Sequence, residues 1–198
     1  MNYGFIGAGN MAGAIIKGMT VGTGSFEGKD IFVYDLNASA AKSLADICKV
    51  NVCSSAEDVI ASSDVLVLAV KPNVLPAVVT QLKNKIIEKS PLVVSIAAGK
   101  TLEFLEGLIA KDFPIVRVMP NINAKVGCAT SAFCTTETVS DEQKDIVKKL
   151  FSTVGAVTEL SEKMFSIHSV IGGAAPAFAY LYIDALSRAA VKAGMPKK

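Results

Sequence analysis

Two glycines near the start of the chain stand at a spacing that suits phosphate chemistry. The segment Gly7-Ala8-Gly9-Asn10-Met11-Ala12 fits G-x-G-x-x-A, follows an apolar run that ends at Ile6, and opens a stretch with apolar residues at helical spacing. In such a strand-to-helix turn the first glycine permits the tight bend, the second lets a pyrophosphate reach the backbone, and the small third residue allows close packing. The pattern predicts a dinucleotide site, with an ordinary structural turn as its alternative.

Asp35 follows the second predicted strand, where a carboxylate can accept a hydrogen bond from an adenosine ribose. Its distance from the glycines exceeds the usual spacing of about 20 residues because the glycine-rich loop 21–30 intervenes. A carboxylate there favours NAD over NADP, and no arginine follows it. Asn37 and Ser39 could still hydrogen-bond a 2′-phosphate, and Asp35 could be a simple turn former. The choice between NAD and NADP therefore stays open.

Strands and helices alternate through most of the chain and must position these groups. The apolar runs predict strands over residues 3–6, 31–34, 50–53, 65–70, 92–96, 115–119, 127–135 and 156–160. Helices are expected over 10–19, after Asn37 or Ser39, after Ser54 or Ser55, through 75–82, after Thr101, and after Ser140 or Asp141. Right-handed crossovers between such strands place helices on both faces. We therefore expect an α/β fold with a doubly wound, mostly parallel Rossmann sheet.

From Glu162 onward the sequence shows no strand pattern. A short helix over 165–170, a break at Gly172-Gly173 and a long helix from Pro176 to about Gly194 are expected. The long helix carries an apolar stripe between Phe178 and Ala190 that it cannot bury by itself. We therefore place a boundary near residue 161, with a dinucleotide-binding domain over 1–161 and an all-α segment over 162–198.

The composition is that of a globular protein with a large core. Hydrophobic residues make up 51% and charged residues 19% of the chain, and the net charge is +2, which points to neither nucleic acid nor a membrane surface. No segment reaches the roughly 18 to 20 apolar residues that a membrane span needs, and no signal peptide is recognised, so we expect a cytoplasmic protein. The four cysteines and the lone His168 lack metal-type spacing, so we expect reduced thiols, no metal, and a packed helical histidine.

Over its whole length the sequence resembles the pyrroline-5-carboxylate reductases of proline biosynthesis. The likeness is carried by FIGAGNMAGAIIKGM at the start, DVLVLAVKPN over 64–73, VVSIAAGKT over 93–101, VRVMPN over 116–121, and GGAAPAFAYLYIDALSRAAVKAGMPK over 172–197. This resemblance implies hydride transfer from NAD(P)H, usually NADPH, to the C=N carbon of 1-pyrroline-5-carboxylate, which gives L-proline. It also implies that the C-terminal segment begins a helical dimerisation domain of a homo-oligomer.

The resemblance adds further site residues to Asp35 and Asn37, which the end of the second strand already indicates. Those expected to bind the cofactor are Ile6, Gly7, Ala8, Gly9, Asn10, Met11, Asp35, Asn37, Ala69, Val70, Lys71, Pro72, Ile96, Ala97 and Ala98. Met119, Pro120 and Asn121 are expected near the nicotinamide and the substrate. Lys71 could instead be a solvated charge, and Met119 and Pro120 could serve packing alone. No catalytic acid is assigned, because a protonated imine is already electrophilic and positioning supplies most of the rate.

Three departures from the family pattern bear on the substrate pocket. The family usually has Thr-Pro after the MPN motif, and this chain has Ile122-Asn123. The family commonly has Ser-Gly-Ser-Gly before the proline of the long helix, whereas residues 172–175 read Gly-Gly-Ala-Ala. Family members continue through helices that carry a Gly-Gly-Thr-Thr loop for the substrate carboxylate. Because no other part of the sequence is expected to pack on the apolar stripe of the long helix, we expect this sequence to be a truncated form. If the Gly-Gly-Thr-Thr loop is missing, we expect the chain to be inactive alone.

Two other functions remain open at this stage. One is another imine or β-hydroxyacid dehydrogenase of the same superfamily, although those usually place a catalytic Lys and Asn on the helix after the sheet. The other is a catalytically silent nucleotide-binding fragment, which would bind NAD(P)H without turnover.

Overall fold

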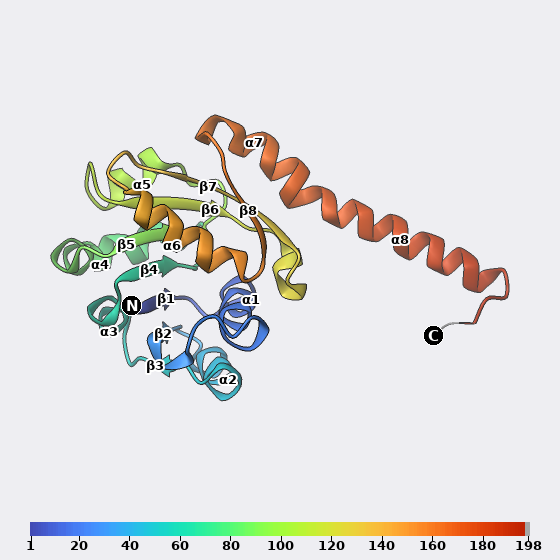
Figure 1. Cartoon of the computed structure of the whole chain (residues 1–198), viewed down its shortest axis with the longest axis horizontal. Coiled ribbons are helices and arrows are strands. Elements are labelled where there is room, and N and C mark those ends of the chain that lie inside the picture. Colours follow the sequence, from blue (N-terminus) through green and yellow to red (C-terminus); the bar gives the residue numbers. More distant parts are fainter. Residues whose placement is uncertain (197–198) are drawn as a thin grey trace.

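An eight-stranded sheet forms the centre of the protein in this computed structural model, which describes residues 1–196 (Figure 1). Its strands are β1 (Tyr3–Ile6), β2 (Ile31–Tyr34), β3 (Asn51–Val52), β4 (Val65–Leu68), β5 (Leu92–Ser95), β6 (Ile115–Met119), β7 (Ala129–Thr135) and β8 (Gly155–Glu159). The order is β3-β2-β1-β4-β5-β6-β7-β8, and all neighbours are parallel except β6 and β7. The predicted doubly wound, mostly parallel sheet is confirmed.

Helices cover both faces of this sheet. They are α1 (Asn10–Lys17), α2 (Ala38–Cys48), α3 (Ala56–Ser62), α4 (Leu75–Lys89), α5 (Leu102–Leu108), α6 (Asp141–Ser152), α7 (Phe165–His168) and α8 (Ala175–Lys192). Side chains of α1, α2 and α6 belong to one buried cluster, and those of α3, α4 and α5 belong to another. The sheet therefore separates two hydrophobic cores.

The central strand β4 shows why its sequence is apolar throughout. Val65 and Val67 contribute to one core, and Leu66 and Leu68 contribute to the other, as the two-residue period of a strand requires. The strand is shorter than the predicted run 65–70. Ala69 N–H still donates to Ile6 O at 2.9 Å, but beyond it the chain turns away from the sheet.

Side-chain caps start several helices where the sequence places them. Ser55 and Asp58 form a capping box at the start of α3, and Ser140 and Gln143 form another at the start of α6. Thr101 Oγ1 accepts a hydrogen bond from Phe104 N–H at the start of α5. Asn37 precedes α2 but makes no side-chain cap.

The C-terminal part is one nearly uninterrupted helix, so the predicted break at Gly172-Gly173 is wrong. A 3₁₀ turn (Glu162–Met164), α7, a π-helical segment (Ser169–Ala174) and α8 follow one another directly. A Cβ on Gly172 would lie 2.7 Å from Cε1 of His168. The glycine thus makes room for this imidazole, and the chain passes through a π-helical turn instead of ending.

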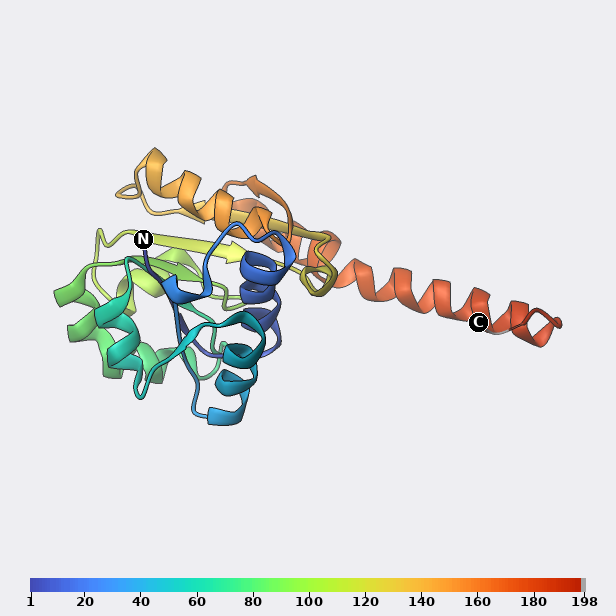
Figure 2. The same ribbon diagram turned by 60° about the horizontal axis from the view of Figure 1, so that its bottom comes forward.

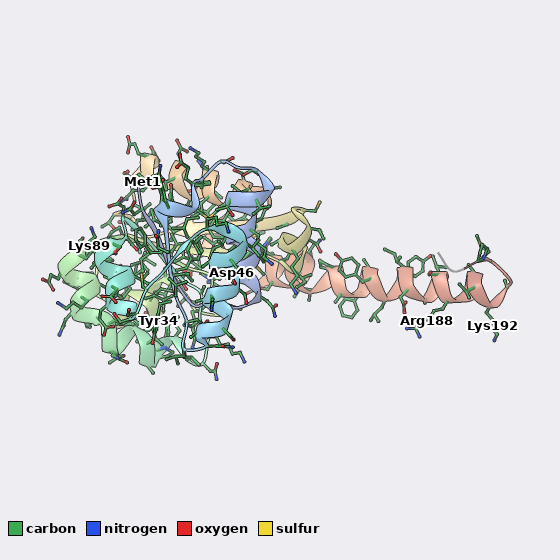
Figure 3. All side chains as sticks on the ribbon, turned by 90° about the horizontal axis from the view of Figure 1, so that it is seen from below. Met1, Tyr34, Asp46, Lys89, Arg188 and Lys192 are labelled. Carbon is green, nitrogen blue, oxygen red and sulfur yellow. The ribbon has the colours of Figure 1, made fainter. Side chains whose placement is uncertain are left out.

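Helix α8 projects away from the sheet and its helices (Figures 1 and 2). None of its described residues is buried, and Phe178, Leu181 and Tyr182 are each at least 66% exposed. In Figure 3 the side chains of its outer part, including Arg188 and Lys192, stand clear of the rest of the molecule. The predicted apolar stripe is therefore present and has no partner within the chain that the structure describes.

This C-terminal helix changes one expectation about membranes. Among the described residues, Glu162–Lys192 is long and apolar enough by length and composition to cross a membrane, with a mean hydropathy of 1.3 over 18 residues. The expectation that no segment reaches that standard is wrong here, because the apolar residues on both sides of the two glycines lie in one helix. A single helix of this kind is weak evidence for a membrane span.

A partly buried ion pair joins the sheet to this C-terminal helix. Arg117 of β6 donates from Nη1 to Glu162 Oε1 at 2.8 Å, and Leu102 N–H donates to the same oxygen at 2.8 Å. The guanidinium also lies over the ring of Phe165 at 4.4 Å. Burial has the largest effect on the Cys134 thiol and the nearby Glu162 carboxylate the next largest, and they raise the pKa of this thiol to about 12. At neutral pH, Cys134 therefore acts as a small apolar side chain.

The substitution Glu162→Gln tests how much the Arg117–Glu162 ion pair contributes to stability. It leaves Arg117, whose side chain is 9% exposed, without its counter-charge, so we expect a loss of about 2 kcal/mol in the free energy of unfolding. Glu88→Gln is the matched control, because it removes an exposed pair with Lys85 and is expected to cost less than about 0.5 kcal/mol. Urea denaturation of both variants gives the comparison, and equal effects would contradict the structural role of Glu162.

Candidate dinucleotide-binding site

Gly7 forms the bend between β1 and α1. Its φ is +108°, and a Cβ on it would lie 2.7 Å from Ala69 O. Its N–H donates to Tyr34 O at 2.8 Å, so the bend is attached to the end of β2. A side chain is excluded here both by backbone conformation and by space.

Gly9 lacks a side chain for a different reason. It is the N-cap of α1 with φ −71°, which any residue adopts, and a Cβ on it would meet no atom within 4 Å. The first bond of the helix runs from Gly13 N–H to Gly9 O at 2.8 Å, and no side chain caps the helix start. The turn therefore offers open space next to uncapped N–H groups, which suits a pyrophosphate.

Asp35 ties the glycine turn to the end of β2. Its Oδ2 accepts from Ala8 N–H at 2.6 Å, and its Oδ1 accepts from Asn37 N–H at 2.8 Å. The carboxylate is half-buried and is held by two backbone donors on different loops. The bond to Asn37 N–H is that of an Asx turn, whereas the bond to Ala8 N–H joins Asp35 to the glycine turn, which a simple turn former does not do.

A cleft of about 360 Å³ lies between the glycine turn, the end of β2 and the turn after β4. Seven predicted cofactor residues line it: Ile6, Gly7, Gly9, Asp35, Ala69, Val70 and Lys71. Other lining residues were not predicted, among them Tyr34, Leu36, Glu57, Val74, Val78 and Gln81. Glu57 could have been found, because the Ser55–Asp58 capping box places it in the first turn of α3.

A larger groove of about 1210 Å³ lies on the other side of the turn. Ala8, Gly9 and Asn10 line one part of it, and the remainder is formed by α1 and the turn 18–23 after it, α2, the segment 124–127 and the end of α6 at 152–153. Gly9 lines both spaces, so a ligand on the turn can extend from one to the other.

The remaining predicted residues lie at the same edge of the sheet but outside the two cavities. Residues 96–98 follow β5 and residues 119–121 end β6, next in order after β4. Because carboxyl ends of parallel strands meet at one edge, all the predicted clusters share it. The structure does not bring Met11, Asn37, Pro72, residues 96–98 or residues 119–121 into the lining of either cavity.

Residues 119–121 contact the C-terminal helix. Asn121 is 5% exposed and donates from Nδ2 to Gly172 O at 2.8 Å. His168 Nε2 lies 3.3 Å from Met119 O, and Ser169 Oγ donates to Met119 Sδ at 3.0 Å. His168 is thus packed against the sheet edge, as predicted. The expected substrate-proximal strand end is held by the base of the long helix.

This arrangement suits the binding of an anionic, extended ligand more than acid–base or metal chemistry of its own. No group of three or more His, Cys, Asp or Glu residues that could hold a metal occurs within residues 1–196. All four cysteines are free thiols. The site provides backbone N–H groups, one fixed carboxylate and apolar walls, which are the parts of a dinucleotide site.

Comparison with known proteins gives consistent matches. A family model described as NADP oxidoreductase, coenzyme F420-dependent, matches residues 2–99. The pyrroline-5-carboxylate reductase of Arabidopsis thaliana is 37% identical over 98% of this chain and 70% of that protein. The Escherichia coli enzyme of the same name is 35% identical over 98% of this chain and 71% of its own length.

Solved structures agree in fold. The pyrroline carboxylate reductase of Plasmodium falciparum, crystallised with NADP bound, has a TM-score of 0.88 at 30% identity and covers 99% of this chain and 71% of that one. The Coxiella burnetii pyrroline-5-carboxylate reductase has a TM-score of 0.90 at 31% identity, over 98% of this chain and 72% of that one.

Substitutions can distinguish the structural role of Gly7 from the ligand-binding role of Gly9. Gly7→Ala forces φ +108° on a residue with a Cβ close to Ala69 O, so we expect a loss of at least about 2 kcal/mol in the free energy of unfolding. Gly9→Ala has space for its methyl group and should fold normally, but it should weaken NADH or NADPH binding at least about tenfold because the methyl group occupies the phosphate seat.

Gly107→Ala in α5 is the matched control, because its Cβ also meets nothing within 4 Å and it lies outside both cavities. Denaturation curves and nicotinamide fluorescence titrations of the three variants give both quantities. Normal cofactor affinity in Gly9→Ala would show that the turn is structural only.

Proposed function

The chain belongs to the family of pyrroline-5-carboxylate reductases, and we infer from this that it is an oxidoreductase that reduces 1-pyrroline-5-carboxylate to L-proline with NAD(P)H. The observation that carries the inference is the 37% identity to a reductase of this name over 98% of the chain. The cleft at the carboxyl ends of β1, β2 and β4 agrees with it, because open α/β sheets bind dinucleotides where the strand order reverses.

The residues present fit the cofactor. Gly9 leaves a space that a Cβ would fill, and α1 has no side-chain cap, so the pyrophosphate has a backbone seat at residues 7–11. Asp35 stands where a ribose hydroxyl can donate, and Ala69–Lys71 form the opposite wall of the cleft. When bound, NAD(P)H supplies a hydride to the C=N carbon of the substrate.

The chain's own contribution is mostly positioning. We place residues 96–98 and 119–121 beside the nicotinamide and the substrate, as the family resemblance implies. Asn121, nearly buried and bonded to Gly172 O, holds the end of β6 against the helical segment. Alignment of the substrate carbon with the nicotinamide then supplies most of the rate acceleration. No residue is assigned as a proton donor.

We propose two domains, with the dinucleotide-binding part over 1–161 and the start of a helical domain over 162–198, of which Lys197 and Lys198 lie outside the described residues. The last strand ends at Glu159, and α8 buries none of its residues within the chain. We further propose a homo-oligomer that is cytoplasmic and has no nucleic-acid or membrane partner. The exposed apolar residues of α8 then pack against a second copy.

A direct assay tests the function. The purified chain is incubated with 1-pyrroline-5-carboxylate and NADH or NADPH, and both nicotinamide absorbance and proline are measured. We expect proline to form in step with nicotinamide oxidation, which would also show that the inactivity expected without the Gly-Gly-Thr-Thr loop is wrong. Gly9→Ala should reduce kcat/KM at least about tenfold, and Gly107→Ala should leave it unchanged.

The alternatives give different results in the same assay. A catalytically silent nucleotide-binding fragment would bind NAD(P)H but form no proline, and another imine or β-hydroxyacid dehydrogenase would oxidise the cofactor only with a different substrate. Either result would contradict reductase activity for this chain.

The oligomer proposal is tested on α8. Leu181→Lys and Leu186→Lys place charges on residues that are 66% and 54% exposed, so they should leave the fold intact and convert the wild-type oligomer to a monomer. Ile87→Lys, on the 41% exposed Ile87 of α4, is the control and should keep the oligomer. Light scattering after gel filtration measures the mass, and a monomeric wild type would overturn the proposal.

A further inference from the structure

The end of the cleft that receives the adenosine ribose is negatively charged. Asp35 is fixed there by Ala8 N–H and Asn37 N–H, at 2.6 Å and 2.8 Å. Glu57, from the first turn of α3, lines the same cleft. Lys71 is the one cationic side chain among the described residues that line it. Two carboxylates and one amine therefore line this cleft.

Two backbone donors and the serine hydroxyl beside Asp35 are already engaged. Asp35 uses the N–H groups of Ala8 and Asn37, which are the backbone donors nearest to it. Ser39 Oγ donates to Asn37 Oδ1 at 2.6 Å, so its hydroxyl proton is also in use. The residue after Asp35 is Leu36, 88% exposed, where a cation would be needed to balance a phosphate.

We propose that this chain selects NADH over NADPH and that Asp35 determines the choice, with Glu57 adding to it. The proposal rests on the proposed function, because it concerns the cofactor of the same site. A ribose 2′-hydroxyl donates to the fixed carboxylate, whereas a 2′-phosphate brings a charge of about −1.5 to −2 against Asp35 and Glu57. Like charges at such a contact cost enough for a preference of at least about tenfold.

The dissociation constants of NADH and NADPH, measured by nicotinamide fluorescence on the full chain, test the preference without any turnover. We expect NADH to bind at least about tenfold more tightly than NADPH. The ratio of the two dissociation constants should approach one as the salt concentration rises, because salt screens the repulsion of the 2′-phosphate. In the double variant with Asp35→Ser and Leu36→Arg, NADPH should become the tighter ligand. Asp46→Ser is the control, because Asp46 is an exposed carboxylate on α2 outside the cleft, labelled in Figure 3, and its removal should leave the ratio unchanged.

If the double variant with Asp35→Ser and Leu36→Arg fails to fold, Glu57→Gln still tests the proposed preference for NADH. This side chain is half-exposed on α3, and its change should strengthen NADPH binding a few-fold with no effect on NADH. Equal or tighter NADPH binding by the wild-type chain would overturn the preference while leaving the dinucleotide site intact. Failure to bind either cofactor would overturn the site itself, and with it both the preference and the proposed function.

Discussion

The bend at Gly7 is the constraint on which the rest of this structure depends. Strand β1 lies between β2 and β4, so the chain must leave the sheet between two occupied neighbours. It does so with φ +108° and with Ala69 O only 2.7 Å from where a Cβ would stand. That bend aims the start of α1 at the sheet edge and opens the cleft where the strand order reverses. Gly9, Asp35 and the turn after β4 then complete the lining of that cleft.

A second constraint joins this edge to the C-terminal helix. The Arg117–Glu162 pair and the bond from Asn121 to Gly172 O both connect the β6 region to the helical segment. The strand end next to the expected nicotinamide position is therefore held by the same helix whose outer part lacks a partner. The end of β6 and the exposed helix α8 are thus connected through these two contacts.

Much of the fold followed from the sequence because its signals are local. The continuous apolar run at 65–68 predicts a strand buried on both faces, and Ser55 with Asp58 predicts the start of α3. The direction of β7 could not be predicted, because alternation of side chains has the same period in parallel and antiparallel strands. The break expected at Gly172-Gly173 was wrong, because helix propensity does not reveal that a glycine accommodates His168.

The site was predictable to a similar degree. Gly7, Gly9 and Asp35 came from a motif with a physical mechanism, and the structure brings them together. The bonds that fix Asp35 to Ala8 and Asn37 depend on the spatial meeting of two loops, which no spacing along the chain contains. The capping box predicts the place of Glu57 in the first turn of α3, but its place in the cleft depends on the packing of α3 beside β1.

The cofactor seat on the glycine turn is tested most directly by the backbone amide NMR spectrum of the chain during titration with NADH. We predict that the amide resonances of Gly9, Asn10 and Val70 shift together in one saturable process, because these residues surround the seat. Shifts confined to Lys17, Val21 and Val126, at the far part of the larger groove, would place the ligand elsewhere and contradict the seat.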